Sequence, residues 1–129
     1  MVHKFSIIIP CYNEENTVFD VVNEICIKFN ETQIIVVDDG STDKSLDELH
    51  KIEHSNLNIL ELAKNQGKGK AMRTGLEKAK TISDIVIFTD ADKEILINDI
   101  AKVFDYYKNN NVDAVFGSRF LNISKKKIF

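Results

Sequence analysis

The stretch "QIIVVDDGSTD", residues 33–43, decides the fold. Its apolar run is continuous rather than alternating, and it is built from the β-branched residues Ile and Val. Such a run is typical of a strand buried on both faces of a parallel sheet. Two acids, Asp38 and Asp39, end the run, and a glycine turn follows. Because ligands bind outside the carboxyl ends of parallel strands, these acids mark a candidate site.

Working outward, apolar runs of strand length alternate with segments of helical period. In the first helical segment Val18, Val21, Val22 and Ile25 form one stripe. The order predicts an α/β sandwich with a mainly parallel sheet and right-handed crossovers, in one domain spanning residues 1–129. The predicted strands are residues 5–9, 33–37, 57–60, 84–88 and 112–116.

Composition narrows the class of protein. The chain has 129 residues, 43% of them hydrophobic and 29% charged, as in a globular domain, and its net charge of −3 gives no support for a nucleic-acid partner. Cys11 and Cys26 are predicted to be buried, reduced thiols. No signal peptide or membrane span is apparent, so a soluble, cytoplasmic chain is expected. The basic run 125–127 is either a solvated tail or a weak contact for anionic lipids.

Polar residues follow the first strand. Pro10 is predicted to halt the strand, and Tyr12 and Asn13 bring an aromatic ring and an amide to the edge of the sheet. Glu14 suits the positive end of the following helix. A simple turn with a helix cap explains the proline and the acid, but it does not require Tyr12.

The second strand end carries more acid than a loop needs. Either Asp43 or the Ser41–Thr42 pair can cap the next helix. One acid of the Asp38–Asp39 pair is then expected to accept hydrogen bonds from a nucleotide's ribose or base.

The third strand end is basic. "NQGKGKAMRTG" supplies Lys68, Lys70 and Arg73 beside small residues. Cations at a helix N-terminus are unfavourable unless an anion is present, which favours a phosphate contact. A flexible basic loop is the alternative, and the Walker A spacing is absent.

The fourth and fifth strand ends complete the edge. Asp90 and Asp92, separated by Ala91, can converge on a hard cation such as Mg²⁺ or Mn²⁺, or can form an Asx turn. Arg119 can clamp an anion or pair with a surface acid.

Together, "FSIIIPCYNEE", "IIVVDDGSTD", "NQGKGKAMRTG", "FTDADKE" and "FGSRF" resemble the family 2 inverting glycosyltransferases of the GT-A fold. They are most similar to the branch that acts on polyprenyl (dolichyl) phosphates. The resemblance runs from about residue 5 to about residue 121. It implies a Rossmann-like three-layer sandwich, truncated at its C-terminal side.

The resemblance also implies roles for individual residues. Asp90 and Asp92 match the two acids of the DxD motif, and the metal, Mg²⁺ or Mn²⁺, is expected on Asp92 together with Asp90. Asp90, Asp92 and Arg119 form the implied catalytic set. The implied donor-nucleotide set is Pro10, Tyr12, Asn13, Glu14, Asp38, Asp39, Lys68, Arg73, Asp90 and Ala91.

The implied function is inverting transfer of a sugar from a UDP- or GDP-sugar to an acceptor such as a polyprenyl phosphate, in cell-envelope biogenesis. Contact with the inner face of a membrane and self-association are expected with it. Relatives continue well beyond the "GSR" stretch, so the chain is expected to be the donor-binding part, incomplete at the acceptor side. Lys93 and Glu94 depart from the mannosyl pattern, which leaves the sugar unassigned.

Other classes of protein fit less well. A receiver domain of two-component signalling would place its acid pair after the first strand and a lysine after the fifth. A Rossmann dehydrogenase would need GxGxxG directly after the first strand, and none is present. A non-catalytic fragment that binds a nucleotide sugar remains the alternative to an enzyme.

Overall fold

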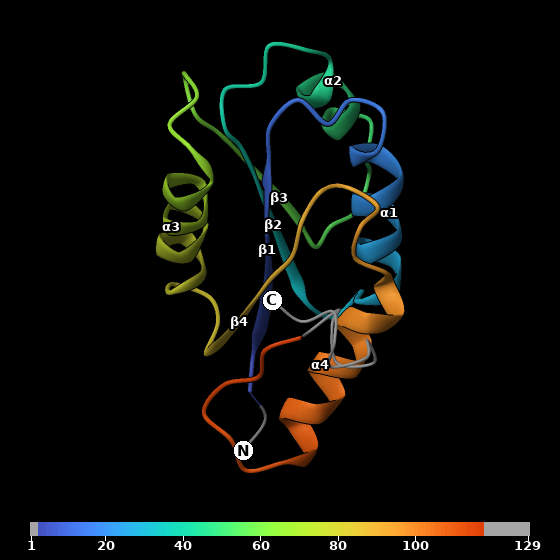
Figure 1. Cartoon of the computed structure of the whole chain (residues 1–129), viewed down its shortest axis with the longest axis vertical. Helices are drawn as coiled ribbons and strands as arrows, with labels where there is room; N and C mark the ends of the chain where they lie inside the picture. The colour runs from blue at the N-terminus through green and yellow to red at the C-terminus, as the bar shows by residue number, and fades with distance from the viewer. Residues whose placement is uncertain (1–2, 118–129) are drawn as a thin grey trace, which may run out of the picture. The chain divides into compact units, whose positions relative to one another are not determined.

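The computed structural model describes residues 3–117, and these fall into two compact units, one ending at Ile95 and the other beginning at Leu96 (Figure 1). The second unit contains helix α4 (Ile97–Asn109). The first unit holds the sheet and three helices. Its elements are β1 (Phe5–Cys11), α1 (Val18–Lys28), β2 (Gln33–Asp38), α2 (Ser45–His50), β3 (Leu57–Glu61), α3 (Lys68–Ala79) and β4 (Ile85–Phe88).

The four strands form one parallel sheet in the order β3-β2-β1-β4. Ile8 in the middle of β1 is aligned with Ile35 of β2 and with Phe88 of β4. This arrangement confirms the predicted α/β fold with a parallel sheet. The chain runs outward from β1 to β3 and then returns to the other side of β1. The gap between the carboxyl ends of β1 and β4 is therefore a topological switch point, where ligands bind in such sheets.

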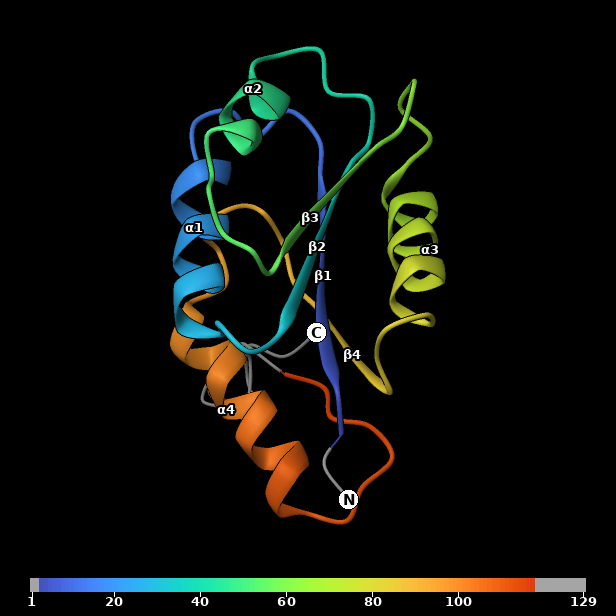
Figure 2. The ribbon, with the colours of Figure 1, turned by 180° about the vertical axis from the view of Figure 1, so that it is seen from behind.

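Helices cover both faces of this sheet. Helix α3 lies on one face, and α1 and α2 lie on the other (Figures 1 and 2). The α3 face buries Ile8, Ile35 and Val37 against alanines of the helix. Gly75 permits close packing here, because a Cβ at this position would lie 2.5 Å from Cγ2 of Ile8.

The prediction that Pro10 halts the first strand is wrong. Pro10 lies within the strand, aligned with Val37, and β1 continues to Cys11. Neighbouring hydrogen bonds explain the difference: the Cys11 carbonyl accepts from the β2 side, whereas the Ile8 carbonyl accepts from Thr89 on the β4 side. Pro10 shares the orientation of Ile8, so its missing N–H ends only the pairing with β4.

The predicted fifth strand is wrong. Residues 112–116 have no strand structure, and the Phe116 side chain is 89% exposed. A strand exists only through its ladder of hydrogen bonds to a neighbour, and a mostly apolar run of five residues does not supply one. Arg119 and the basic run 125–127 lie outside the described residues. Within residues 3–117, no helix is both long and apolar enough to cross a membrane.

Candidate donor site at the carboxyl edge of the sheet

The loops that follow the four strands meet at one edge of the sheet (Figure 1). The loop after β1 and the loop after β4 flank the switch point, and a hydrogen bond joins them: Thr17 Oγ1 donates to the Ala91 carbonyl at 3.0 Å. The topology therefore brings the predicted DxD segment beside the "PCYNEE" segment, about 75 residues earlier in the sequence.

Asn13 joins the loop after β1 to the loop after β2. Its backbone has φ of 51°, a left-handed conformation that asparagine tolerates better than most residues. Its N–H donates to Ser41 Oγ at 3.0 Å, and its side-chain Oδ1 accepts from the backbone N–H of Thr42 at 2.8 Å. The Asn13 amide therefore has a structural role. Its contact with the donor nucleotide stays a prediction.

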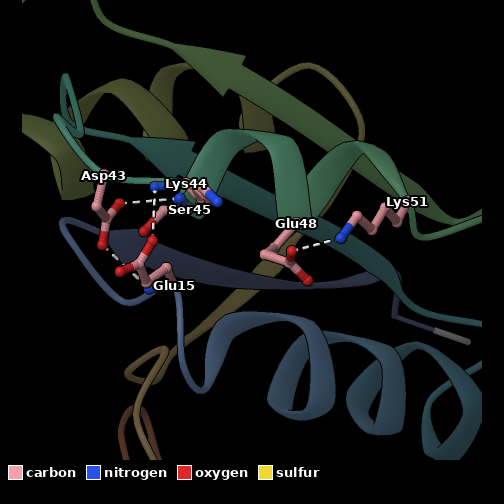
Figure 3. Close-up of polar contacts among 6 residues, drawn as sticks. All are labelled: Glu15, Asp43, Lys44, Ser45, Glu48 and Lys51. Atoms are coloured by element: carbon pink, nitrogen blue, oxygen red, sulfur yellow. Dashed lines mark hydrogen bonds and ion pairs between the residues drawn. The ribbon is translucent and has the colours of Figure 1, made fainter.

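A second set of bonds reinforces this junction (Figure 3). Asp43 Oδ2 accepts from the Glu15 N–H at 3.2 Å, and Glu15 Oε2 accepts from the Lys44 N–H at 3.0 Å. Asp43 Oδ1 also accepts from the N–H of Ser45, the first residue of α2, at 2.8 Å. In turn, Ser45 Oγ accepts from the Glu14 N–H at 2.7 Å. Hydrogen bonds thus join the two loops into one wall of the site.

The surroundings in this wall favour the ionised form of Asp43 and the neutral form of the Cys11 thiol. Desolvation alone would raise the pKa of Asp43, but hydrogen bonds from Ser45 and from the Glu15 N–H lower it below its ordinary value. At Cys11, burial and then the charge of Asp38 raise the pKa to about 12, against a weaker opposing bond from Ser45. Cys11 is therefore a neutral, packed residue and not a nucleophile at neutral pH.

Asp38 and Asp39 are both buried, with side chains only 2% and 3% exposed. Asp38 turns back on its own loop and accepts from Ser41 Oγ at 2.5 Å and Ser41 N–H at 3.1 Å. Asp39 instead reaches the loop before α3 and accepts from the N–H groups of Gln66 and Gly67 at 2.8 and 2.9 Å. All four carboxylate oxygens therefore have a donor from the chain, which offsets their desolvation.

Gly40 allows the loops after β2 and β3 to approach backbone to backbone. Its φ is 67°, and a Cβ there would lie 2.4 Å from the carbonyl carbon of Lys64 and 2.5 Å from the nitrogen of Asn65. Any side chain would push these loops apart, so the glycine is required by close approach as well as by φ.

The two acids of the predicted DxD motif have different surroundings. Asp90 Oδ1 pairs with the ammonium of Lys68, the first residue of α3. Asp92 Oδ1 accepts from the Glu94 N–H at 3.0 Å, which closes the Asx turn that was the alternative interpretation. Asp90 is therefore paired with a cation, whereas Asp92 stabilises a turn.

Asp90 and Asp92 are the described side chains that could take part in holding a divalent cation shared with a substrate. Within residues 3–117, no group of three or more His, Cys, Asp or Glu side chains could hold a metal alone. Mg²⁺ is usually bound by one or two carboxylates, with water and substrate phosphates completing its shell. Asp90 and Asp92 can supply these two carboxylates. Of the two, Asp92 forms no ion pair with a lysine or arginine among residues 3–117.

Other predicted residues lie at varying distance from this centre. Tyr12, at 43% exposed, presents its ring to solvent at the edge, as a residue that stacks on a base would. Arg73 is exposed on α3, five residues beyond Lys68, which turns it roughly 140° around the helix. No ion pair joins Arg73 to an acid in the described part of the chain.

Two contacts at this edge were not anticipated from sequence. One is the grip of Asp39 on Gln66 and Gly67, and the other is the pair between Lys68 and Asp90. For the first, the available signal was an acid beyond what capping requires, followed by a glycine; for the second, it was a helix that starts with lysines and has no acid in its first turn.

Comparison with known proteins gives a consistent result. The sequence model of the family "Glycosyl transferase family 2" matches residues 6–128. A UDP-N-acetylglucosamine–dolichyl-phosphate N-acetylglucosaminyltransferase of Methanococcus voltae is 38% identical over 90% of the chain, which spans 52% of that relative. The chain thus covers about half the length of this relative.

Solved structures agree in fold. Glucosyl-3-phosphoglycerate synthase of Mycobacterium tuberculosis, in complex with Mn²⁺, UDP-glucose and phosphoglyceric acid, matches with a TM-score of 0.57 and 29% identity, over 70% of this chain and 33% of that one. The mannosyltransferase PcManGT of Pyrobaculum calidifontis, in complex with GDP-mannose and Mn²⁺, matches with a TM-score of 0.70 and 24% identity, over 82% and 32%. The latter shows similarity of fold alone.

Proposed function

The chain belongs to glycosyl transferase family 2, and from this premise we propose that it is the donor-binding part of an inverting glycosyltransferase. Its donor is a UDP- or GDP-sugar, and its acceptor is a polyprenyl phosphate. The observation that carries the proposal is the junction at the switch point: acids from β2 and β4, and a lysine from α3, lie in one unit at one edge of the sheet.

The chemistry follows from the charges. An acceptor oxygen forms a bond to the anomeric carbon as the bond from that carbon to the nucleoside diphosphate breaks. A bound Mg²⁺ or Mn²⁺ neutralises the charge that develops on the diphosphate. Asp92 and Asp90 would hold the cation, and Lys68 would supply a further positive charge. Since a polyprenyl phosphate is already an anion, it needs no general base from this part of the chain.

Support from relatives is of two kinds. The archaeal relative carries a dolichyl phosphate acceptor in its name, and the mycobacterial structure holds UDP-glucose with Mn²⁺. A lipid acceptor places the reaction at a membrane surface. The protein would therefore contact the cytoplasmic side of the membrane peripherally and act in envelope biogenesis. The roles of Pro10, Tyr12, Asn13 and Arg73 toward the nucleotide remain part of this proposal.

Calorimetry tests donor binding. UDP-glucose, UDP-GlcNAc and GDP-mannose are titrated with and without Mn²⁺, and one base is expected to bind in a Mn²⁺-dependent way. Asp92→Asn keeps the oxygen that accepts the Glu94 N–H but removes the charge, so it is expected to weaken donor binding roughly tenfold or more. Asp47→Asn, an exposed acid on α2, is the control for loss of charge.

The outcomes separate the proposal from its alternative. If no donor binds, or if both variants behave alike, the donor site is refuted. Donor binding without transfer of labelled sugar to polyprenyl phosphate would favour the non-catalytic fragment.

A further inference from the structure

The pair between Lys68 and Asp90 suggests more than a surface contact. Both side chains are partly open to solvent, at 61% and 31% exposed, and both belong to the proposed donor site. We propose that Lys68 is an exchangeable counter-ion. It holds Asp90 while the protein is free of metal, and it leaves Asp90 for the donor's diphosphate when a divalent cation takes the carboxylate. This inference rests on the proposed function.

Lys68 and Asp90 follow strands at opposite edges of the sheet, yet their side chains meet. β3, which precedes α3, and β4, which precedes Asp90, are the two outer strands of the sheet. Three strand spacings of about 4.8 Å separate them, or about 14 Å. Asp39, at the end of β2, binds the N–H groups of Gln66 and Gly67 directly before Lys68. The buried anchor therefore fixes the start of α3 above an inner strand, from which the Lys68 side chain can reach across.

The charges at the start of α3 explain why exchange is feasible. The helix begins with Lys68 and also carries Lys70 in its first turn, which contains no acid. Positive side chains oppose the helix dipole there, so the carboxylate of Asp90 offsets an otherwise unfavourable arrangement. When Asp90 is given to a metal, the same position requires another anion. A diphosphate that arrives with the metal supplies it.

The energetics also favour exchange. An ion pair with this much solvent exposure contributes little, so a cation that binds Asp90 meets a weak competitor and not a locked site. Lys68 is also suited to moving between partners, because its ammonium is a point charge on a flexible stem. A buried, bidentate arginine pair would resist such a change.

The chain provides a matched control. Lys70 lies two residues further along α3, is exposed, and its side chain has no acid partner among residues 3–117. Lys70→Met therefore removes the same charge from the same turn without breaking the pair. Lys68→Met removes both, and Lys68→Arg keeps a cation that can still pair with Asp90.

Two titrations test the exchange on the full chain. In the first, Mn²⁺ alone is added and free Mn²⁺ is followed by electron paramagnetic resonance. Lys68→Met is expected to bind Mn²⁺ roughly two- to fivefold tighter than wild type, since its competitor is gone. Lys68→Arg and Lys70→Met are expected to stay within about twofold. In the second, UDP and GDP are added at saturating Mn²⁺, and Lys68→Met is expected to bind the preferred one roughly tenfold more weakly.

The opposite signs of the two effects are the signature of exchange. If Lys68→Met and Lys70→Met bind Mn²⁺ equally, including no binding by either, the exchange is refuted. A Lys68→Met variant that binds both metal and nucleotide as wild type does would also refute it. Failure of the proposed function appears differently, as a wild-type chain that binds neither UDP nor GDP at any Mn²⁺ concentration.

Discussion

Asn substitutions at the adjacent acids Asp38 and Asp39 should have unequal effects on stability, although the two side chains are buried to the same degree. Asp39 accepts from two backbone N–H groups, which can only donate. An asparagine offers one oxygen and one NH₂ group, so one of these partly buried N–H groups would face another donor. Asp38 accepts from one N–H and one hydroxyl of Ser41. That hydroxyl can rotate and accept from the new NH₂ group.

The magnitudes follow from the bonds that are lost. A hydrogen bond to a charged group contributes about 1.5–3 kcal/mol, and leaving a partly buried donor unpaired adds up to about 1 kcal/mol. Because the remaining bond is kept in weaker form, Asp39→Asn should lower the free energy of unfolding by about 2–4 kcal/mol. Asp38→Asn keeps both bonds without the charge and should lower it by about 1 kcal/mol.

Urea unfolding followed by far-UV circular dichroism measures the difference. With a slope of about 1.5 kcal/mol per M urea, a loss of about 3 kcal/mol moves the midpoint down by about 2 M. Asp47→Asn, on the exposed side of α2, loses only a charge in the first helical turn and should lower the free energy of unfolding by less than about 1 kcal/mol. If Asp38→Asn and Asp39→Asn differ by less than about 0.5 kcal/mol, Asp39 is not the anchor of the loop before α3.

Further expectations concern pH, thiols, packing and association. Because hydrogen bonds hold the pKa of folded Asp43 below 3.8, its stabilising contribution is complete above that pH and is lost as the pH falls through the lower folded value; Asp43→Asn should flatten this acid limb in pH-dependent unfolding. Burial raises the pKa of Cys11 to about 12 and that of the second cysteine to about 11, so Ellman's reagent at pH 8 should label neither thiol until urea unfolds the chain. Gly75→Ala places a methyl group against fully buried Ile8 and should cost about 1–3 kcal/mol, whereas Gly69→Ala meets nothing within 4 Å and should be neutral or stabilising; equal effects would contradict the packing. Self-association, expected from sequence, should appear in light scattering as a mass above 14.7 kDa, and a monomer at high concentration would refute it.

Most of the fold prediction rested on the pattern of apolar residues along the sequence. Residues 34–37 are fully buried in β2, as their continuous apolar run predicts for an inner parallel strand. Residues 112–116 share the apolar character, interrupted only by Asp113, and they form no strand in the structure. Propensity favours a strand in both cases, but only the pairing partner makes one, and a partner is not encoded locally.

The partners within the site were harder to predict than its members. The acids, the lysine and the asparagine lie at the carboxyl edge of the sheet, as expected, because strand ends are visible in the sequence. Which N–H group each carboxylate binds depends on how the loop before α3 returns across the sheet. That path is fixed by Asp39 and by the close approach at Gly40, both of which are contacts between segments about 25 residues apart.

The distribution of satisfied polar groups shows which side of the site is complete. After β1 and β2, the side chains of Asn13, Asp38 and Asp43 all have partners from the chain. After β4, the Thr89 hydroxyl is the one buried side-chain oxygen or nitrogen in residues 3–117 without a hydrogen bond. Asp90 follows it directly, and its one partner in this part of the chain is the exposed Lys68. Because an unpaired buried group costs free energy that a ligand or a local shift can recover, change on donor binding should concentrate on the β4 side. Among the described residues, the wall built from the first two loops has no such unpaired group, so we expect it to stay in place while the β4 side and Lys68 rearrange.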